Sequence, residues 1–144
     1  MRFRATLLIA CALLPLAAIG ATAQCRPGGE KQIAEVRDSW VKNWNDGQLG
    51  NVVNLYYSHA LLLTADGSRA SGKDEIRAAF QKQIGSKVDV HSLGPAWSGA
   101  LAYENGTYTQ TANGQSVEGN YLVVLLFGTD GKWLIVQHAS TAKR

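Results

Sequence analysis

Residues 101–127, LAYENGTYTQTANGQSVEGNYLVVLLF, decide the fold class. Residues 101–111 and 121–127 have the composition of two strands, rich in Tyr, Thr, Val and Leu. Asn113-Gly114 between them is typical of a two-residue hairpin turn, because these residue types tolerate a positive φ. A long antiparallel hairpin is therefore predicted, and Gly106 within its first strand is the expected position of a β-bulge.

The chain on both sides of this hairpin is also extended. Residues 87–92 alternate between apolar and polar side chains, which is typical of a half-buried strand. After a turn at Thr129-Asp130-Gly131, a last strand is predicted from Trp133 to Ser140. About four antiparallel strands therefore follow one another from Lys87 onward.

Before residue 87 the apolar residues follow helical spacing instead. A first helix is predicted before Asn45-Asp46-Gly47, with the apolar face Ile33, Val36, Trp40, Val41 and Trp44. A second helix is predicted over Leu49 to Tyr57 and a short strand over Ala60 to Leu63. Ser71 is the expected N-cap of a third helix with the buried stripe Ile76, Ala79, Phe80 and Ile84.

Helices in the first half and strands in the second predict an α+β fold, with about three helices packed on one face of a curved antiparallel sheet. The strand from Tyr121 to Phe127 is apolar on both of its faces. An apolar outer face is unfavourable in water and is commonly buried against a second subunit, so we expect a homodimer.

The first residues are expected to be removed. Arg2 and Arg4 precede an apolar run over 5–19, and Ala21-Thr22-Ala23 has the small–x–small pattern of a cleavage site. About fifteen apolar residues are few for a membrane span, and Cys11 lies too early for a lipoprotein signal. We expect a signal peptide over 1–23, a flexible leader over 24–31 and one domain over 32–142. The mature protein would be secreted or periplasmic, with no membrane attachment.

Charge and cysteine content restrict the partners. The formal net charge of +3 includes Arg2 and Arg4, and without them 12 basic residues face 11 acidic ones. This balance, without a basic cluster, argues against nucleic acid as a partner. Cys25 would be the only mature cysteine, so no internal disulfide is expected. A free thiol is favoured over pairing with another chain.

Four short motifs in the same order resemble a known family: Asp66-Gly67, Gly72-Lys73-Asp74-Glu75-Ile76, residues 102–108 (AYENGTY) and residues 131–136 (GKWLIV). They resemble the SnoaL-like, ketosteroid-isomerase-like branch of the nuclear-transport-factor-2-like superfamily. The likeness is strongest to the group described as domain of unknown function 4440. More distantly, the motifs resemble the association domain of calcium/calmodulin-dependent kinases. The resemblance implies a cone with an internal pocket, usually dimeric, but no single reaction.

The resemblance also implies positions for three catalytic groups. In the ketosteroid isomerases an Asp removes a proton beside a carbonyl, and a Tyr and a protonated acid hold the resulting oxyanion. The position of the base is Thr64 here, that of the acid is Val123, and Trp40 and Trp44 stand where the helical Tyr is expected. Ketosteroid-type isomerisation is therefore not expected.

Other residues are weaker catalytic candidates: Asp66, His91, Glu104 and His138. A neutral histidine can act as a general base, but a surface or hydrogen-bonded role is favoured for both histidines. Asp66 fits a turn better than a catalytic role. Whether His138 points inward is left open, because both faces of its strand are mostly apolar. The histidines lie too far apart in sequence for a recognisable metal site, and no cofactor is expected.

The leading hypothesis is an exported domain that binds a small, largely apolar molecule in the pocket, without established catalysis. The residues predicted to line this pocket are Trp40, Trp44, Tyr57, Thr64, Tyr103, Tyr108 and Val123. One alternative is an enzyme that performs proton transfer or hydration with a non-standard set of residues. The other is a dimerisation or assembly module whose pocket is filled by its own side chains.

Overall fold

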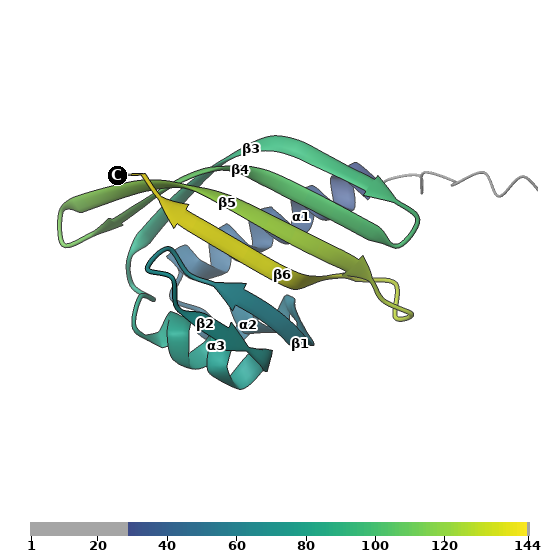
Figure 1. The fold of residues 1–144 in the computed structure, drawn as a ribbon, viewed down its shortest axis with the longest axis horizontal. Helices are drawn as coiled ribbons and strands as arrows, with labels where there is room; N and C mark the ends of the chain where they lie inside the picture. Colours follow the sequence, from purple (N-terminus) through teal and green to yellow (C-terminus); the bar gives the residue numbers. More distant parts are fainter. Residues whose placement is uncertain (1–28, 144) are drawn as a thin grey trace, which may run out of the picture.

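The computed structural model describes residues 29–143 (Figure 1). The predicted signal peptide over 1–23, Cys25 and most of the leader lie outside the described residues. In chain order the elements are α1 (Gly29–Asn45), α2 (Leu49–Asn54), β1 (Tyr56–Leu63), β2 (Arg69–Ser71), α3 (Gly72–Gln81), β3 (Lys87–Ser98), β4 (Leu101–Ala112), β5 (Gln115–Phe127) and β6 (Trp133–Ala142). This order confirms the α+β class.

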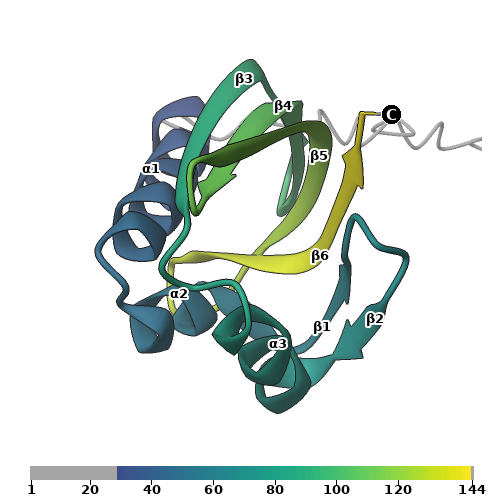
Figure 2. The same ribbon diagram turned by 90° about the vertical axis from the view of Figure 1, so that its left-hand side faces the viewer.

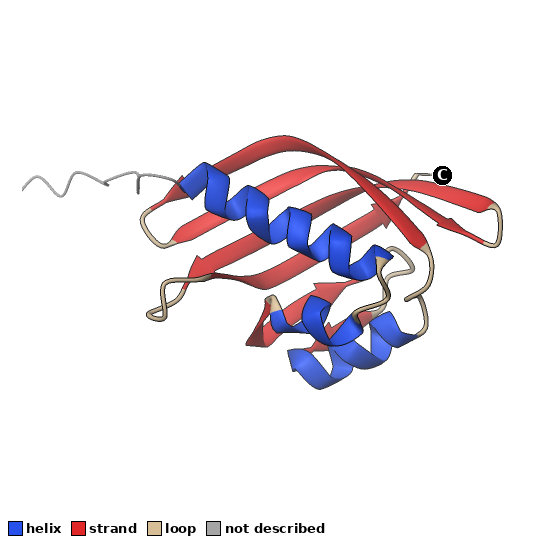
Figure 3. Cartoon of the chain, turned by 180° about the vertical axis from the view of Figure 1, so that it is seen from behind, coloured by secondary structure: helices blue, strands red, loops and turns tan. Residues whose placement is uncertain are grey.

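The six strands form one open, curved sheet with the order β2-β1-β6-β5-β4-β3. Neighbouring strands are antiparallel except β1 and β6, which are parallel. Helix α1 crosses one face of the sheet, as seen from behind in Figure 3, and α2 and α3 lie at the end beside β1 and β2 (Figure 2). The space enclosed between α1, α3 and the sheet is where a pocket is expected in this architecture.

Helix α1 begins earlier than predicted. Gly29 to Lys31, expected in the leader, form the first turn of the helix. Gly29 is buried against the indole of Trp97, and a Cβ there would approach Nε1 of Trp97 to 2.8 Å. The small residue therefore lets the start of α1 pack directly on β3.

The second helix ends earlier than predicted, at Asn54 rather than Tyr57. The backbone N–H of Ile135 donates to the carbonyl of Leu55, and Tyr56 pairs with Ile135 across the parallel β1–β6 ladder. Pairing with a strand far along the chain thus overrides the local helical pattern. As a result β1 begins at Tyr56, whose ring is fully buried.

The hairpin of β4 and β5 is confirmed. Ala112 pairs with Gln115, and the two residues between them, Asn113 and Gly114, have φ values of 52° and 76°. Two successive positive φ values are the signature of a type I′ turn.

The predicted bulge at Gly106 was wrong in its position. Gly106 pairs regularly with Ser92 and Tyr121, and the irregularity lies on β3, where Leu93 and Gly94 face the single residue Asn105. Gly106 is needed for another reason. A Cβ at this position would lie 2.1 Å from the carbonyl oxygen of His91, so only glycine permits this close approach of the strands.

The core lies between α1, α3 and the inner face of the sheet. Three of the four residues predicted for the buried stripe of the third helix lie in α3, with Ile76 and Phe80 buried and Ala79 packed at the edge of the core. Ile84 also packs there but follows the end of the helix at Gln81. No helix within residues 29–143 is long and apolar enough to cross a lipid bilayer.

Trp133, at the start of β6, is 3% exposed and packs edge-on against Phe127, with 5.2 Å between ring centroids. Trp133→Ala should lower the free energy of unfolding by about 3–5 kcal/mol, because it removes a large buried side chain. Chemical denaturation would measure the change. Leu93→Ala, at an exposed leucine of β3, is the control and should shift stability by no more than about 0.5 kcal/mol. A wild-type denaturation curve for Trp133→Ala would contradict the packing described.

Candidate functional site

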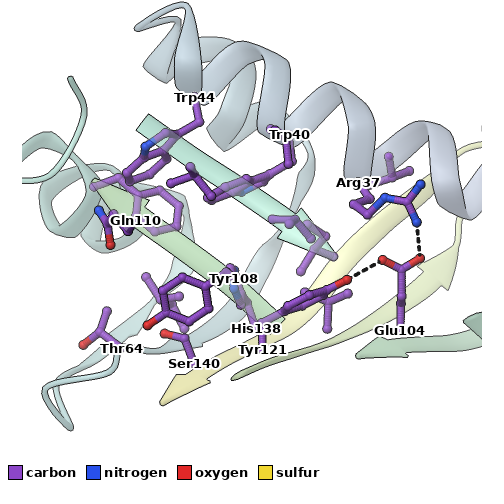
Figure 4. Close-up of a pocket in the computed structure, with 18 of the residues that line it drawn as sticks. Arg37, Trp40, Trp44, Thr64, Glu104, Tyr108, Gln110, Tyr121, His138 and Ser140 are labelled. Atoms are coloured by element: carbon purple, nitrogen blue, oxygen red, sulfur yellow. Dashed lines mark hydrogen bonds and ion pairs between the residues drawn. The ribbon is translucent and has the colours of Figure 1, made fainter. Parts of the chain in front are cut away.

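A cavity of about 250 Å³ opens between α1, α3 and the inner face of the sheet (Figure 4). Its walls are mostly apolar and include Val36, Trp40, Val90, Val123 and Leu125. The rings of Trp40 and Trp44 stack in α1 with centroids 4.9 Å apart and form one aromatic wall. A preformed hollow with apolar walls and a few polar groups is typical of small-molecule sites.

Five of the seven predicted lining residues lie along this cavity: Trp40, Trp44, Thr64, Tyr108 and Val123. The other two predictions were wrong. Tyr57 is 41% exposed, in an irregular part of β1 where three successive residues face solvent. Tyr103 is 49% exposed because its neighbours Ala102 and Glu104 point inward, and successive side chains of a strand alternate between faces.

Two tyrosines lie against glycines of the neighbouring strand at the floor of the cavity. Tyr121 on β5 pairs with Gly106 on β4, and Tyr108 on β4 pairs with Gly119 on β5. A Cβ at Gly119 would lie 2.5 Å from the ring of Tyr108, and one at Gly106 would lie 2.8 Å from the ring of Tyr121. The absence of a side chain at these glycines leaves room for the rings and so shapes the cavity floor.

A bulge in β6 turns His138 into the cavity. Leu125 pairs with Ile135 and Val124 pairs with Gln137, so Val136 is an extra residue in the ladder. Ile135 is inward before the bulge, and without the extra residue Gln137 rather than His138 would follow it on the same face. The bulge resolves the face of β6 that the alternation pattern left open.

Three side chains from three elements form a hydrogen-bonded chain beside the cavity. Nε1 of Trp40 on α1 donates to the hydroxyl oxygen of Tyr56 on β1 at 3.0 Å. The same oxygen lies 2.7 Å from Nδ1 of His138 on β6. Because Trp40 can only donate, the Tyr56 hydroxyl accepts from it, and Nδ1 of His138 is the one acceptor that the described residues offer to the hydroxyl hydrogen.

His138 is surrounded by protein, although part of its ring remains accessible because it lines the cavity. Burial lowers the pKa of His138 to about 4, since the charged imidazolium loses its hydration there. The imidazole is therefore neutral at neutral pH. The same loss of hydration raises the pKa of the Tyr56 hydroxyl, which remains protonated as the donor in the chain.

Glu104 is 1% exposed, and both of its carboxylate oxygens have partners. The Tyr121 hydroxyl donates to Oε1 at 2.9 Å, and Nη1 of Arg37 donates to Oε2 at 3.2 Å (Figure 4). Burial and then the hydrogen bond to Glu104 raise the pKa of Tyr121. Arg37 was missed at the sequence level. It lies on the apolar stripe of α1, four residues after Ile33, and an arginine at such a position calls for a buried acidic partner.

Asp66 and His91 do not supply reactive groups inside the cavity. Asp66 is exposed at its mouth, where the carboxylate accepts hydrogen bonds from the Thr64 hydroxyl at 2.6 Å and the Ser68 backbone at 2.9 Å. These bonds lower the pKa of Asp66 to about 2. The carboxylate therefore stabilises the turn, which is the role that the sequence favoured over a catalytic one. His91 is exposed on β3, whereas Val88 and Val90 point inward, so the hypothesis that it acts in the pocket was wrong.

No cluster of three or more histidine, cysteine or acidic side chains that could hold a metal is present within residues 29–143. Several polar groups around the cavity are hydrogen-bonded to one another. This arrangement can fix the position of a bound molecule by hydrogen bonding.

No family model and no curated protein matches the chain, but solved structures do. A ketosteroid isomerase-like protein from Erwinia carotovora has a TM-score of 0.73 at 16% identity, with 83% of this chain and 99% of that chain covered. A domain of unknown function with a cystatin-like fold from Nostoc punctiforme has a TM-score of 0.72 at 20% identity, with 83% and 80% covered.

A nuclear-transport-factor-2-like protein of unknown function from Shewanella oneidensis has a TM-score of 0.68 at 19% identity, with 77% of this chain and 97% of that chain covered. The chain has the nuclear-transport-factor-2-like, cystatin-like fold. Identities this low establish the fold and leave the activity to be argued from the cavity.

The depressed pKa of His138 predicts a pH dependence of stability. Between pH 6.5 and pH 4 the unfolded chain binds a proton at this residue that the folded chain does not, so stability is full above pH 6.5 and is lost toward pH 4. Over this range the unfolding free energy of the wild type should fall by up to about 3 kcal/mol more than that of His138→Gln. Denaturation at a series of pH values would measure it. Parallel curves for the two proteins would show that the folded imidazole is protonated as readily as a free one.

Proposed function

We propose that this chain is an exported SnoaL-like domain, related to the domain-of-unknown-function 4440 group, that binds a small, largely apolar molecule in its cavity. The observation that carries the proposal is the cavity itself, which is open and walled by Trp40, Trp44 and aliphatic side chains. An apolar molecule that enters it replaces water against these walls, which favours binding by the hydrophobic effect.

The binding function is favoured over proton-transfer chemistry because the ionisable groups of the cavity are engaged. Both oxygens of Glu104 are occupied, and Nδ1 of His138 faces the Tyr56 hydroxyl. The positions of the isomerase base and acid hold Thr64 and Val123, which line the cavity but cannot exchange protons near neutral pH. A general base needs a free acceptor within reach of the substrate, and the hydrogen bonds to Glu104 and to Nδ1 of His138 occupy acceptor positions that a base would use.

An open cavity also argues against a purely structural module, whose interior would be filled by its own side chains. Some of the largest buried side chains, Trp44, Leu62 and Leu125, line the hollow and leave it unfilled. An unfilled apolar cavity lowers the stability of the fold. A ligand that fills the cavity would offset this cost.

The ligand can be recovered from protein purified from its own host. Organic extraction followed by mass spectrometry should release one small molecule from the wild type and from Val117→Phe, but not from Val123→Phe. Val123 lines the cavity, and a phenyl ring there occupies the space of the ligand, whereas Val117 lies exposed on the same strand. The intact mass would also show whether the mature chain begins at Gln24. An equal yield from all three proteins would place the ligand elsewhere.

We also propose that the outer face of the sheet pairs with a second copy of the chain. Leu101, Tyr103, Leu122 and Leu126 on β4 and β5 are 37–54% exposed. Leu101 pairs directly with Leu126, and Tyr103 and Leu122 lie two and four residues farther along the hairpin on the same face, opposite Val124 and Asn105, so the four form one patch. None of these residues is charged, and a twofold interface brings each patch against itself, where like charges would repel.

A charge placed in this patch should separate the two copies. Tyr103→Lys should be a monomer in light scattering after size exclusion, because two lysines would be buried opposite each other. Val117→Lys, an exposed site near the hairpin turn, should leave the dimer intact. A monomeric wild type would contradict the proposed interface without affecting the proposed ligand site.

A further inference from the structure

The polar groups of the cavity differ in what they can still offer to a ligand. Glu104 uses both oxygens, Gln110 donates to Ser86 at 2.8 Å, and the hydroxyl of Tyr121 donates to Glu104. Two groups are different. No hydrogen bond within residues 29–143 involves the Tyr108 hydroxyl, and none reaches Nε2 of His138, whose Nδ1 is bound to Tyr56. Among the described residues, the fully buried side-chain nitrogens and oxygens that lack a hydrogen-bond partner are the indole nitrogens of Trp97 and Trp133. Nε2 of His138 also lacks a partner but is not one of these atoms, so it is not fully buried and is accessible from the cavity that His138 lines.

The chain from Trp40 determines which nitrogen of His138 carries the hydrogen. The indole N–H of Trp40 can only donate, and it occupies one lone pair of the Tyr56 oxygen. The hydroxyl hydrogen of Tyr56 is then directed to Nδ1 of His138, the other partner of this oxygen. With Nδ1 as acceptor, a neutral imidazole carries its hydrogen on Nε2.

We propose that the Nε2–H of His138 binds a neutral oxygen acceptor, the carbonyl oxygen of a small, otherwise apolar molecule. This inference rests on the proposed ligand-binding function and defines the class of ligand. The imidazole donates one hydrogen bond to the carbonyl, while the aromatic and aliphatic walls hold the rest of the molecule. Trp40 and Tyr56 are positioning residues, since they act through His138.

The charges around the cavity select a neutral acceptor over an anion. The Glu104 carboxyl lies at one end of the cavity, and Asp66, whose pKa is lowered to about 2, is negatively charged at its mouth. The one nearby cation among the described residues, Arg37, is shared by Glu104 and Asp38, at 3.2 Å and 2.9 Å. A carboxylate ligand would lose its hydration without gaining a counter-charge, whereas a carbonyl needs only the hydrogen bond.

Two probes of equal shape test the inference: 2-acetonaphthone, which has a carbonyl group, and 2-isopropenylnaphthalene, which has a methylene group in its place. Calorimetry or competition binding should show the ketone bound about three- to tenfold more tightly by the wild type, as one hydrogen bond provides. His138→Leu should bind both equally. His138→Gln should restore a preference for the ketone, because the amide nitrogen of Gln carries donors at the place of Nε2.

The outcomes separate this inference from the proposed function. Equal binding of the two probes by the wild type would overturn the role of His138 and leave the apolar binding function standing. If neither probe binds, both the inference and the proposed function are contradicted. Retention of the preference in His138→Leu would show that another group holds the carbonyl, and would overturn the assignment to His138.

The hydrogen position can be measured without any ligand. Long-range nitrogen–proton NMR of the wild type should show His138 with a protonated Nε2 and an unprotonated Nδ1 at pH 7. In Tyr56→Phe, which keeps the ring but removes the donor, the two tautomers should mix and the preference for the ketone should decrease. A wild-type spectrum with the hydrogen on Nδ1 would overturn the proposal even if the His138 variants fail to fold.

Discussion

The extra residue at Val136 is the constraint on which the chemistry of the cavity depends. A strand presents every second side chain to one face, so β6 could not place both Ile135 and His138 inward without it. Before the bulge the strand supplies the core with Trp133 and Ile135, and after it the strand supplies the cavity with His138. Because β6 lies between β1 and β5, the bulge also brings His138 next to Tyr56.

The buried polar groups around the cavity are stabilised as two units. Trp40, Tyr56 and His138 satisfy one another at one side, and Glu104 is satisfied by the Tyr121 hydroxyl and the Arg37 guanidinium at the other. A buried polar group without a partner costs about 1–3 kcal/mol, so removing one member destabilises the group it leaves behind. Each unit joins α1 to the sheet, which holds the walls of the cavity at a defined separation.

The features that could be predicted from the sequence are those encoded locally. The β4–β5 hairpin follows from Asn113-Gly114 and the apolar stripe of α1 from its spacing. The end of α2 could not be predicted, because it depends on the pairing of Tyr56 with Ile135. The inward face of β6 was hidden by a bulge that leaves no sequence signature. The aromatic character of Tyr103 suggested a place in the cavity, but the burial of its neighbour Glu104 puts it outside.

The same fold can place its polar groups on different strands, and this determines what the cavity can do. In this chain Glu104 comes from β4 and His138 from β6, with their partners on α1, β1 and β5. An imidazole whose Nδ1 is hydrogen-bonded to Tyr56 does not offer that nitrogen as a free base. A side chain that polarises a carbonyl without a base nearby stabilises the bound molecule and leaves it unchanged. The proposed role of His138 therefore needs only a donor in place, whereas turnover would need a free acceptor as well.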